Sequence, residues 1–345
     1  MKIYISSPGQ FYEGFNSKLR GEGRWLVHLA GILTSQGHNV SIFSNDPLRP
    51  YQHKGVVFTS IHNQLDDPEC DILISMDAFP DLPKSFHKTN ISPLLGKFRS
   101  SQRVWAGFFP LGDYDSPIYD MMPVIHPWNY DQCRNGSANF IPIVTHDKLQ
   151  PPNFRKKRFH WYSKNAHEEP RYIAGVMMAL HELVTKHNVV GSFVDGVQIG
   201  SQRYQKDYPQ NKEDLTKILF KEILVRGSES FSYWAPYDYV QQLISQSKIL
   251  VGVHHPVAAP SMAEIAVYGG FPIQWKNQHD CPPYNYVDIP HLQEEVSDDD
   301  VKEFILEMWN NEELFTKSVL TCQEAISPHS KENASKIIKD FVENL

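Results

Sequence analysis

The sequence is poor in cysteine: its 345 residues contain four, and no two of them form a C-x-x-C pair. The four are Cys70, Cys133, Cys281 and Cys322. Cysteines so few and so widely spaced fit a reducing compartment better than a disulfide framework.

Long apolar runs are also missing. No segment approaches the roughly 20 apolar residues of a transmembrane helix. The first ten residues, MKIYISSPGQ, lack an apolar core long enough for a signal peptide. These two absences predict a soluble, cytoplasmic protein.

Basic charge is not in excess, because 33 Lys and Arg face 40 Asp and Glu, for a net charge of −7. This balance argues against a general nucleic-acid-binding or membrane-surface protein. The chain also lacks the G-x-S-x-G motif of nucleophilic hydrolases and the H-E-x-x-H spacing of metal ligands. What it does have is a globular composition, 41% hydrophobic and 21% charged, and enough length for two domains.

The most informative stretch covers residues 247–275 and predicts a strand, a loop, a short helix and a second strand. Residues 249–253 are apolar and predict a buried strand, and 254–260 predict a loop. Ser261 is expected as the N-cap of a helix over 262–268, with Glu264 in its first turn. Residues 271–275 predict the next strand. The loop then lies at the carboxyl end of a parallel strand, where open α/β sheets bind ligands.

The rest of the chain predicts two α/β domains in tandem. A glycine-containing loop, with Gly21 and Gly23 at its end, precedes a helix over 24–36. Residues 114–135 have no clear period and predict an irregular loop, and 146–157 carry prolines and basic residues typical of a linker. Further strands are predicted at 3–5, 39–44, 56–59, 71–75, 104–109, 140–143, 158–162 and 191–194. Helices are predicted at 171–186, 212–225 and 237–246, and in about three segments of 298–345.

In this order the elements resemble the nucleotide-sugar-dependent glycosyltransferases of the GT-B fold. The match covers less than half of the chain and rests on three pieces. The first is Gly21-Glu22-Gly23-Arg24 with the turn Gly37-His38-Asn39-Val40, and the second is residues 159–181. The third comprises Pro260-Ser261, Glu264-Ile265-Ala266 and Gly270-Phe271-Pro272-Ile273.

The resemblance implies two Rossmann-like domains that face each other across a cleft. An acceptor-binding domain would cover 1–145, a linker 146–157, and a nucleotide-sugar-binding domain 158–330. The last helix, 331–345, would pack back on the first domain. The co-substrate would be a nucleoside-diphosphate sugar, with UDP and GDP conjugates expected, and no metal or other cofactor. The acceptor stays open among a glycan, a lipid-linked saccharide, a small molecule and a nucleic-acid base.

The resemblance and the chemistry of sugar transfer together predict a set of site residues. Glu264 would accept the ribose hydroxyls, and Asp77 would act as the base of an inverting reaction, with Asp113 and His126 as alternatives. His255 is the second predicted catalytic residue. The predicted donor-binding residues are Lys164, Arg171, His254, Ser261, Glu264, Gly21 and Gly23.

The sequence departs from the family at one informative point. Retaining members carry a Glu-x7-Glu pair, and the position that corresponds to its first glutamate is Pro256. Retaining and inverting mechanisms therefore both stay open. Two rival functions remain as well: a nucleotide-sugar epimerase of the same fold, and a catalytically silent subunit that binds a sugar nucleotide or a partner.

Overall fold

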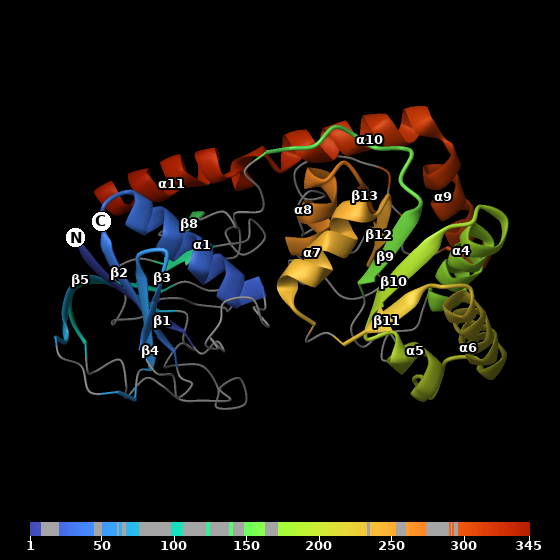
Figure 1. The fold of residues 1–345 in the computed structure, drawn as a ribbon, viewed down its shortest axis with the longest axis horizontal. Helices are drawn as coiled ribbons and strands as arrows, with labels where there is room; N and C mark the ends of the chain where they lie inside the picture. The colour runs from blue at the N-terminus through green and yellow to red at the C-terminus, as the bar shows by residue number, and fades with distance from the viewer. Residues whose placement is uncertain are drawn as a thin grey trace. The chain divides into compact units, whose positions relative to one another are not determined.

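The computed structural model describes most of the chain in fifteen ranges. It divides the chain into two compact units: unit 1 comprises Met1–Val144 and Pro328–Leu345, and unit 2 comprises Thr145–Ser327. Figure 1 shows their elements. The described residues are 1–7, 21–44, 50–60, 62–63, 67–75, 98–105, 122–124, 138–140, 148–162, 172–232, 235–252, 260–273, 290, 292 and 296–345.

Unit 1 is built on a six-stranded sheet in the order β3-β4-β2-β1-β5-β6, in which only the β3–β4 pair is antiparallel. Central strands carry apolar residues in matched register, so that Ile5 lies between Ile42 and Ile74. The strands are β1 (Lys2–Ser7), β2 (Asn39–Ser44), β3 (Tyr51–His53), β4 (Val56–Ser60), β5 (Glu69–Ser75) and β6 (Arg99–Trp105). Short strands β7 (Met122–Val124) and β8 (Ala138–Phe140) form a separate pair.

One face of this sheet is covered by helix α1 (Gly21–Ser35) and by the last helix of the chain, α11 (Lys331–Glu343). Ala334, Ile338 and Phe341 of α11 are buried in the same core as Leu29 and Leu33 of α1. Gln36, the residue after α1, donates from Nε2 to the Ser335 carbonyl of α11 at 2.8 Å and to the Ser335 hydroxyl at 3.2 Å. The last helix therefore belongs to unit 1, as predicted.

Unit 2 has a five-stranded, wholly parallel sheet in the order β11-β10-β9-β12-β13. Its strands are β9 (Arg158–Tyr162), β10 (Val190–Val194), β11 (Glu229–Phe231), β12 (Ile249–Val251) and β13 (Phe271–Ile273). Its helices are α4 (Ile173–Lys186), α5 (Val197–Ser201), α6 (Gln210–Val225), α7 (Tyr237–Gln246), α8 (Pro260–Val267), α9 (Asp298–Asn310) and α10 (Glu312–Ala325), followed by the 3-10 helix η3 (Ser327–His329).

The two faces of this sheet have separate cores. Phe159 and Trp161 of β9 point into the larger core, with residues of α4, α6, α9 and α10. Leu250 of β12 points the other way and packs with Ile244 of α7 and Ile265 of α8. Alternation of side chains along buried parallel strands produces this division.

Both units share one topology. When the parallel strands of each unit are numbered in chain order, which leaves out the antiparallel β3, their order across the sheet is 3-2-1-4-5 in both units. This is the doubly wound arrangement of Rossmann-like domains. The predicted α/β class with two such domains is therefore confirmed. Within the described ranges, no helix combines the length and apolar composition that a membrane span requires.

Several predicted boundaries were wrong. Strand β6 covers 99–105 rather than 104–109, because its first residues, RSSQR, are polar and sit at the sheet edge. Strand β8 covers 138–140 rather than 140–143, and β7 lies within the predicted irregular loop. Strand β12 ends at Val251 rather than at residue 253, and β13 comprises Phe271–Ile273. Residues 106–109, 141–143, 253 and 274–275 lie outside the described residues.

Candidate functional site

The candidate site lies in unit 2, at the carboxyl ends of β9 and β12. The two strands are neighbours, yet the chain continues from β9 to β10 on one side and from β12 to β13 on the other. Their outgoing connections diverge, and the crevice at such a switch point is the usual ligand site of an open parallel sheet. Trp161 pairs with Val251, so both strands end near the same level.

Several predicted site residues belong to segments that leave these strands. Lys164 and Arg171 are in 163–171, after β9, and His254 and His255 are in 253–259, after β12. All four lie outside the described residues, as does Asp77 of unit 1. Their roles remain predictions.

Gly21 and Gly23 belong to a helix rather than to the predicted loop. Helix α1 begins at Gly21, so the predicted start at residue 24 was wrong by most of a turn. Glycine lowers helix propensity by about 1 kcal/mol, but packing of an apolar face outweighs propensity. Leu29 and Leu33 supply that packing. Both glycines lie in the first turn, where backbone N–H groups lack intrahelical acceptors.

Helix α8 begins at Pro260, so Ser261 is a helical residue and not the predicted N-cap. Proline suits the first helical position, because its φ is already helical and the N–H that it lacks would have no acceptor there. Ser261 is 7% exposed. As the second residue of α8, it lies in the first turn, where backbone amide groups favour an anion.

Glu264 is fully buried, with 0% of its surface exposed. The first turn of α8 holds no acidic residue, so Glu264 does not play the predicted dipole-stabilising role there. Its neighbours Ala263 and Ala266 pack into the larger core, and Ile265 packs into the smaller one. A buried carboxylate is costly unless polar groups meet it. The role of Glu264 in donor binding remains a prediction.

The amino end of α4, the helix that follows β9, is closed by an acidic side chain. The Gly175 amide donates to Asp298 Oδ1 at 3.0 Å, and Lys212 Nζ lies 2.6 Å from Asp298 Oδ2. The approach requires glycine, because a Cβ on residue 175 would lie 2.5 Å from the Asp298 carbonyl oxygen. Asp298 thus occupies one amide of the first turn of α4, whereas the first turn of α8 contains no acidic residue. No sequence pattern predicted this contact.

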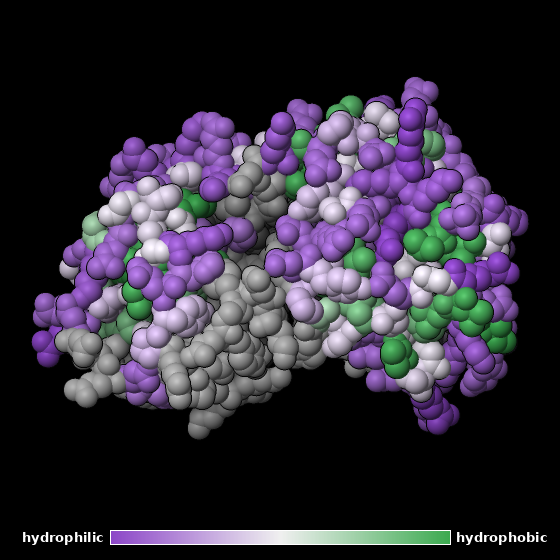
Figure 2. Space-filling view, viewed as in Figure 1, coloured by the Kyte–Doolittle hydropathy of each residue, from purple (hydrophilic) through white to green (hydrophobic). Residues whose placement is uncertain are grey.

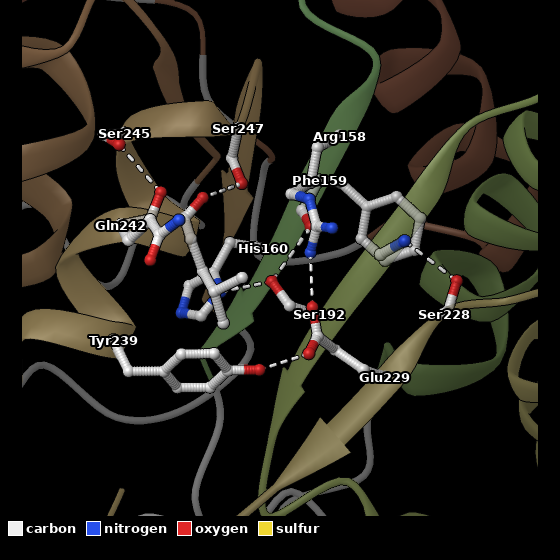
Figure 3. A network of polar contacts seen from close by, with 12 residues as sticks. Arg158, Phe159, His160, Ser192, Ser228, Glu229, Tyr239, Gln242, Ser245 and Ser247 are labelled. Carbon is white, nitrogen blue, oxygen red and sulfur yellow. Dashed lines mark hydrogen bonds and ion pairs between the residues drawn. The ribbon is translucent and has the colours of Figure 1, made fainter. Parts of the chain in front are cut away.

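A polar network lies between β9, β10, β11 and α7 (Figure 3), buried at His160 and Ser192 and exposed at Tyr239. Arg158 Nη1 lies 2.6 Å from Glu229 Oε1, and Tyr239 donates to the other oxygen of Glu229. His160 Nδ1 lies 2.8 Å from Ser192 Oγ. The network joins three strands to α7, and its charged pair lies at the first residues of β9 and β11, the opposite ends of the strands from the candidate site.

His160 has the chemistry of a neutral imidazole. It is 0% exposed and stacks on Phe231, with ring centroids 6.1 Å apart. Burial, aided by the nearby Arg158, lowers the pKa of His160 to about 3. It therefore stays uncharged near neutral pH and serves the packing of β9 rather than proton transfer. Sequence reasoning missed this residue, although a histidine inside the apolar run RFHWY is an unusual feature.

The described residues contain no group of three or more His, Cys, Asp or Glu that could hold a metal ion. Among those same residues, the candidate site thus consists of the α8 amino end, Ser261 and Glu264.

Solved structures with a similar fold are known. HepE from Anabaena, in complex with UDP-glucose, has a TM-score of 0.63 and 10% identity, with 100% of both chains covered. Sucrose-phosphate synthase from Thermosynechococcus elongatus has a TM-score of 0.62 and 10% identity over 99% of this chain and 98% of that one. An alpha-glucosyltransferase in complex with UDP and a 13-mer DNA has a TM-score of 0.59 and 11% identity over 99% of this chain and 98% of that one. No family model matches this chain, and no curated protein matches it in sequence.

Proposed function

We propose that this chain, which has the GT-B fold of the glycosyltransferases it is similar to, transfers a sugar from a nucleoside-diphosphate sugar to an acceptor. The observation that carries the proposal is the position of Glu264 on α8, the helix that follows the switch-point strand β12. HepE binds UDP-glucose, which makes a UDP conjugate the first donor to test.

The donor would lie along the amino end of α8. The Glu264 carboxylate has enough acceptor sites for both ribose hydroxyls, and a low local dielectric strengthens such hydrogen bonds. Amide groups of the first turn, with Ser261, would face the diphosphate. Lys164 and Arg171 would supply positive charge in place of a metal ion, and His254 would contact the donor.

The reaction would form a bond between the acceptor and the anomeric carbon and break the bond from that carbon to the diphosphate. In an inverting reaction Asp77 would take the acceptor's proton, and the nucleoside diphosphate would leave. His255 would hydrogen-bond the sugar or the leaving phosphate. Gly21 and Gly23 would offer backbone N–H groups from unit 1.

Calorimetric titration with UDP tests the donor site. Glu264→Gln should weaken UDP binding by about ten- to a hundredfold, because a hydrogen bond to a charged group contributes about 1.5–3 kcal/mol. Glu213→Gln is the matched control: Glu213 is also a buried helical glutamate, 5% exposed, and it pairs with Lys217 in α6. The control should bind UDP like the wild type. Equal affinity in all three proteins would contradict the proposed role of Glu264.

A second candidate function is a catalytically silent subunit that binds a sugar nucleotide. It is favoured by Pro256, which stands where retaining relatives of the resembling family carry the first glutamate of their pair. The two functions differ in turnover. An enzyme transfers the glucose of UDP-glucose to water or to an added acceptor and releases UDP. A silent subunit binds UDP-glucose and releases no UDP over hours.

A further inference from the structure

The carboxyl end of α8 is held by the segment that precedes β9. The Gln150 amide donates to the Val267 carbonyl at 2.8 Å, and the Asn153 amide donates to the Gly269 carbonyl at 2.9 Å. The last carbonyls of a helix have no intrahelical donor and need partners from elsewhere. Here residues 148–157 supply those partners from the backbone.

Two side chains complete this set of contacts. Gln323 of α10 donates through Nε2 to the Ala266 carbonyl and to the Gln150 carbonyl, both at 2.7 Å. It is 7% exposed, so these bonds are shielded from water. Lys156 donates from Nζ to the Tyr268 carbonyl. We call these contacts at the end of α8 the α8 clamp: they join α8, residues 148–157 and α10.

Gly269 lets the segment pass this close to the helix. Its φ is +72°, and a Cβ at this position would lie 2.1 Å from the Pro151 carbonyl oxygen. Gly227, which follows α6, has a φ of +96°, but a Cβ there would meet no atom within 4 Å. The two glycines share a backbone conformation that side chains disfavour. They differ in whether another segment lies against them.

The α8 clamp involves residues that are close in sequence to both points where the chain passes between its units. The chain enters unit 2 between Val144 and Thr145 and leaves it between Ser327 and Pro328. Residues 148–157 follow the first crossing closely, and Gln323 on α10 shortly precedes the second. A single eight-residue helix thus carries the candidate donor residues near its amino end and both crossing segments at its carboxyl end.

We propose that Gln323 and Gly269 are positioning residues for the donor site, which transmit binding at the amino end of α8 to the two segments that connect the units. The inference rests on the proposed function. A helix of eight residues is about 12 Å long, and α8 is packed on both sides, so its two ends move together. Linkage makes the effect reciprocal: if the α8 clamp strengthens donor binding, donor binding strengthens the α8 clamp.

Amide hydrogen exchange of the full-length protein, with and without saturating UDP, tests the coupling. The reporters are the Gln150 and Asn153 amides, which donate to the end of α8 but lie outside the helix. UDP should slow their exchange by about fivefold, the lower end of usual coupling between sites. Replacement of the Gln323 amide in Gln323→Met should abolish this slowing and weaken UDP binding by about fivefold.

Gly269→Ala and Gly227→Ala form the matched pair. Both suffer the strain of a side chain at positive φ, but only Gly269→Ala must displace residue 151. At equal loss of thermal stability, only Gly269→Ala should weaken UDP binding. If Gly269→Ala does not fold, Gln323→Met still decides the matter.

Three outcomes are distinguishable. UDP that binds the wild type and slows exchange at Gln150 and Asn153 supports the inference, provided that Gln323→Met loses the effect. UDP that binds without slowing exchange there overturns the inference and leaves the proposed function standing. Absence of binding by UDP, GDP, ADP, CDP and TDP overturns both.

Discussion

The ammonium nitrogen of Lys248 lies 3.3 Å from the centroid of the Phe154 ring. The rings of Trp309 and Phe315 lie at 4.7 and 5.2 Å, and the same nitrogen donates to the Trp309 carbonyl at 2.5 Å. The lysine is 2% exposed. A cation enclosed by aromatic faces is attracted by their quadrupoles, yet it has lost most of its hydration.

Lys248 should make the stability of unit 2 depend on pH in the alkaline range. Burial lowers the pKa of Lys248 from 10.5 to about 8. Between these values the unfolded chain binds more protons than the folded one, so stability rises as pH rises from about 8 to 10.5. Lys248→Met should remove about 3 kcal/mol of that rise, since each pKa unit corresponds to about 1.4 kcal/mol. Urea denaturation of both proteins at pH 7.5 and pH 10 gives the free energy of unfolding at each pH and hence the rise.

The control for this experiment is Lys336→Met in α11. The Lys336 side chain is 69% exposed and pairs with Glu332 on the same helix. Its removal should leave the pH dependence of stability as in the wild type. A Lys248→Met profile parallel to the wild-type profile would show that Lys248 keeps an ordinary pKa.

The Asp298 contact with α4 should contribute measurably to stability. Asp298→Ala removes the acceptor of the Gly175 amide and the partner of Lys212, and should lower the free energy of unfolding by about 1–2 kcal/mol. Asp299→Ala is the control, because Asp299 is the next residue in the first turn of α9 and is exposed. It should cost only a few tenths of a kcal/mol through the helix dipole. Equal losses in thermal denaturation would mean that the α4 contact contributes nothing.

Local patterns predicted those elements whose apolar residues repeat clearly. Strands β2 and β9 and helix α7 occupy the residues that the sequence predicted, because each combines a regular apolar pattern with polar flanks. Strands β3 and β11 and helix α5 have three, three and five residues, too few to show a period, and all three were missed.

The candidate site was predictable where it depends on neighbours in sequence and not where it depends on tertiary contacts. Glu264 was selected from its own segment; the structure buries it completely, and its binding role stays a prediction. Asp298 lies 123 residues from Gly175, and Gln323 lies 173 residues from Gln150. Neither partner carries a sequence pattern, so only the folded chain reveals that each pair meets.

The His160–Ser192 pair should limit stability in acid. The lowered pKa of His160, about 3, means that the folded chain binds fewer protons than the unfolded chain between pH 3 and 6.5. The contribution of this group is therefore complete above pH 6.5 and is lost as pH falls toward 3.

Glutamine at position 160 does not titrate and still reaches hydrogen-bonding distance of a hydroxyl. Between pH 7 and pH 4, His160→Gln should thus lose several kcal/mol less stability than the wild type, because each pKa unit corresponds to about 1.4 kcal/mol. Urea denaturation at the two pH values measures this difference. His187→Gln, at an exposed position just after α4, should follow the wild-type profile. If His160→Gln instead falls in parallel with both, His160 has the same pKa in the folded and unfolded chains, and burial of the imidazole seen in Figure 3 does not lower it.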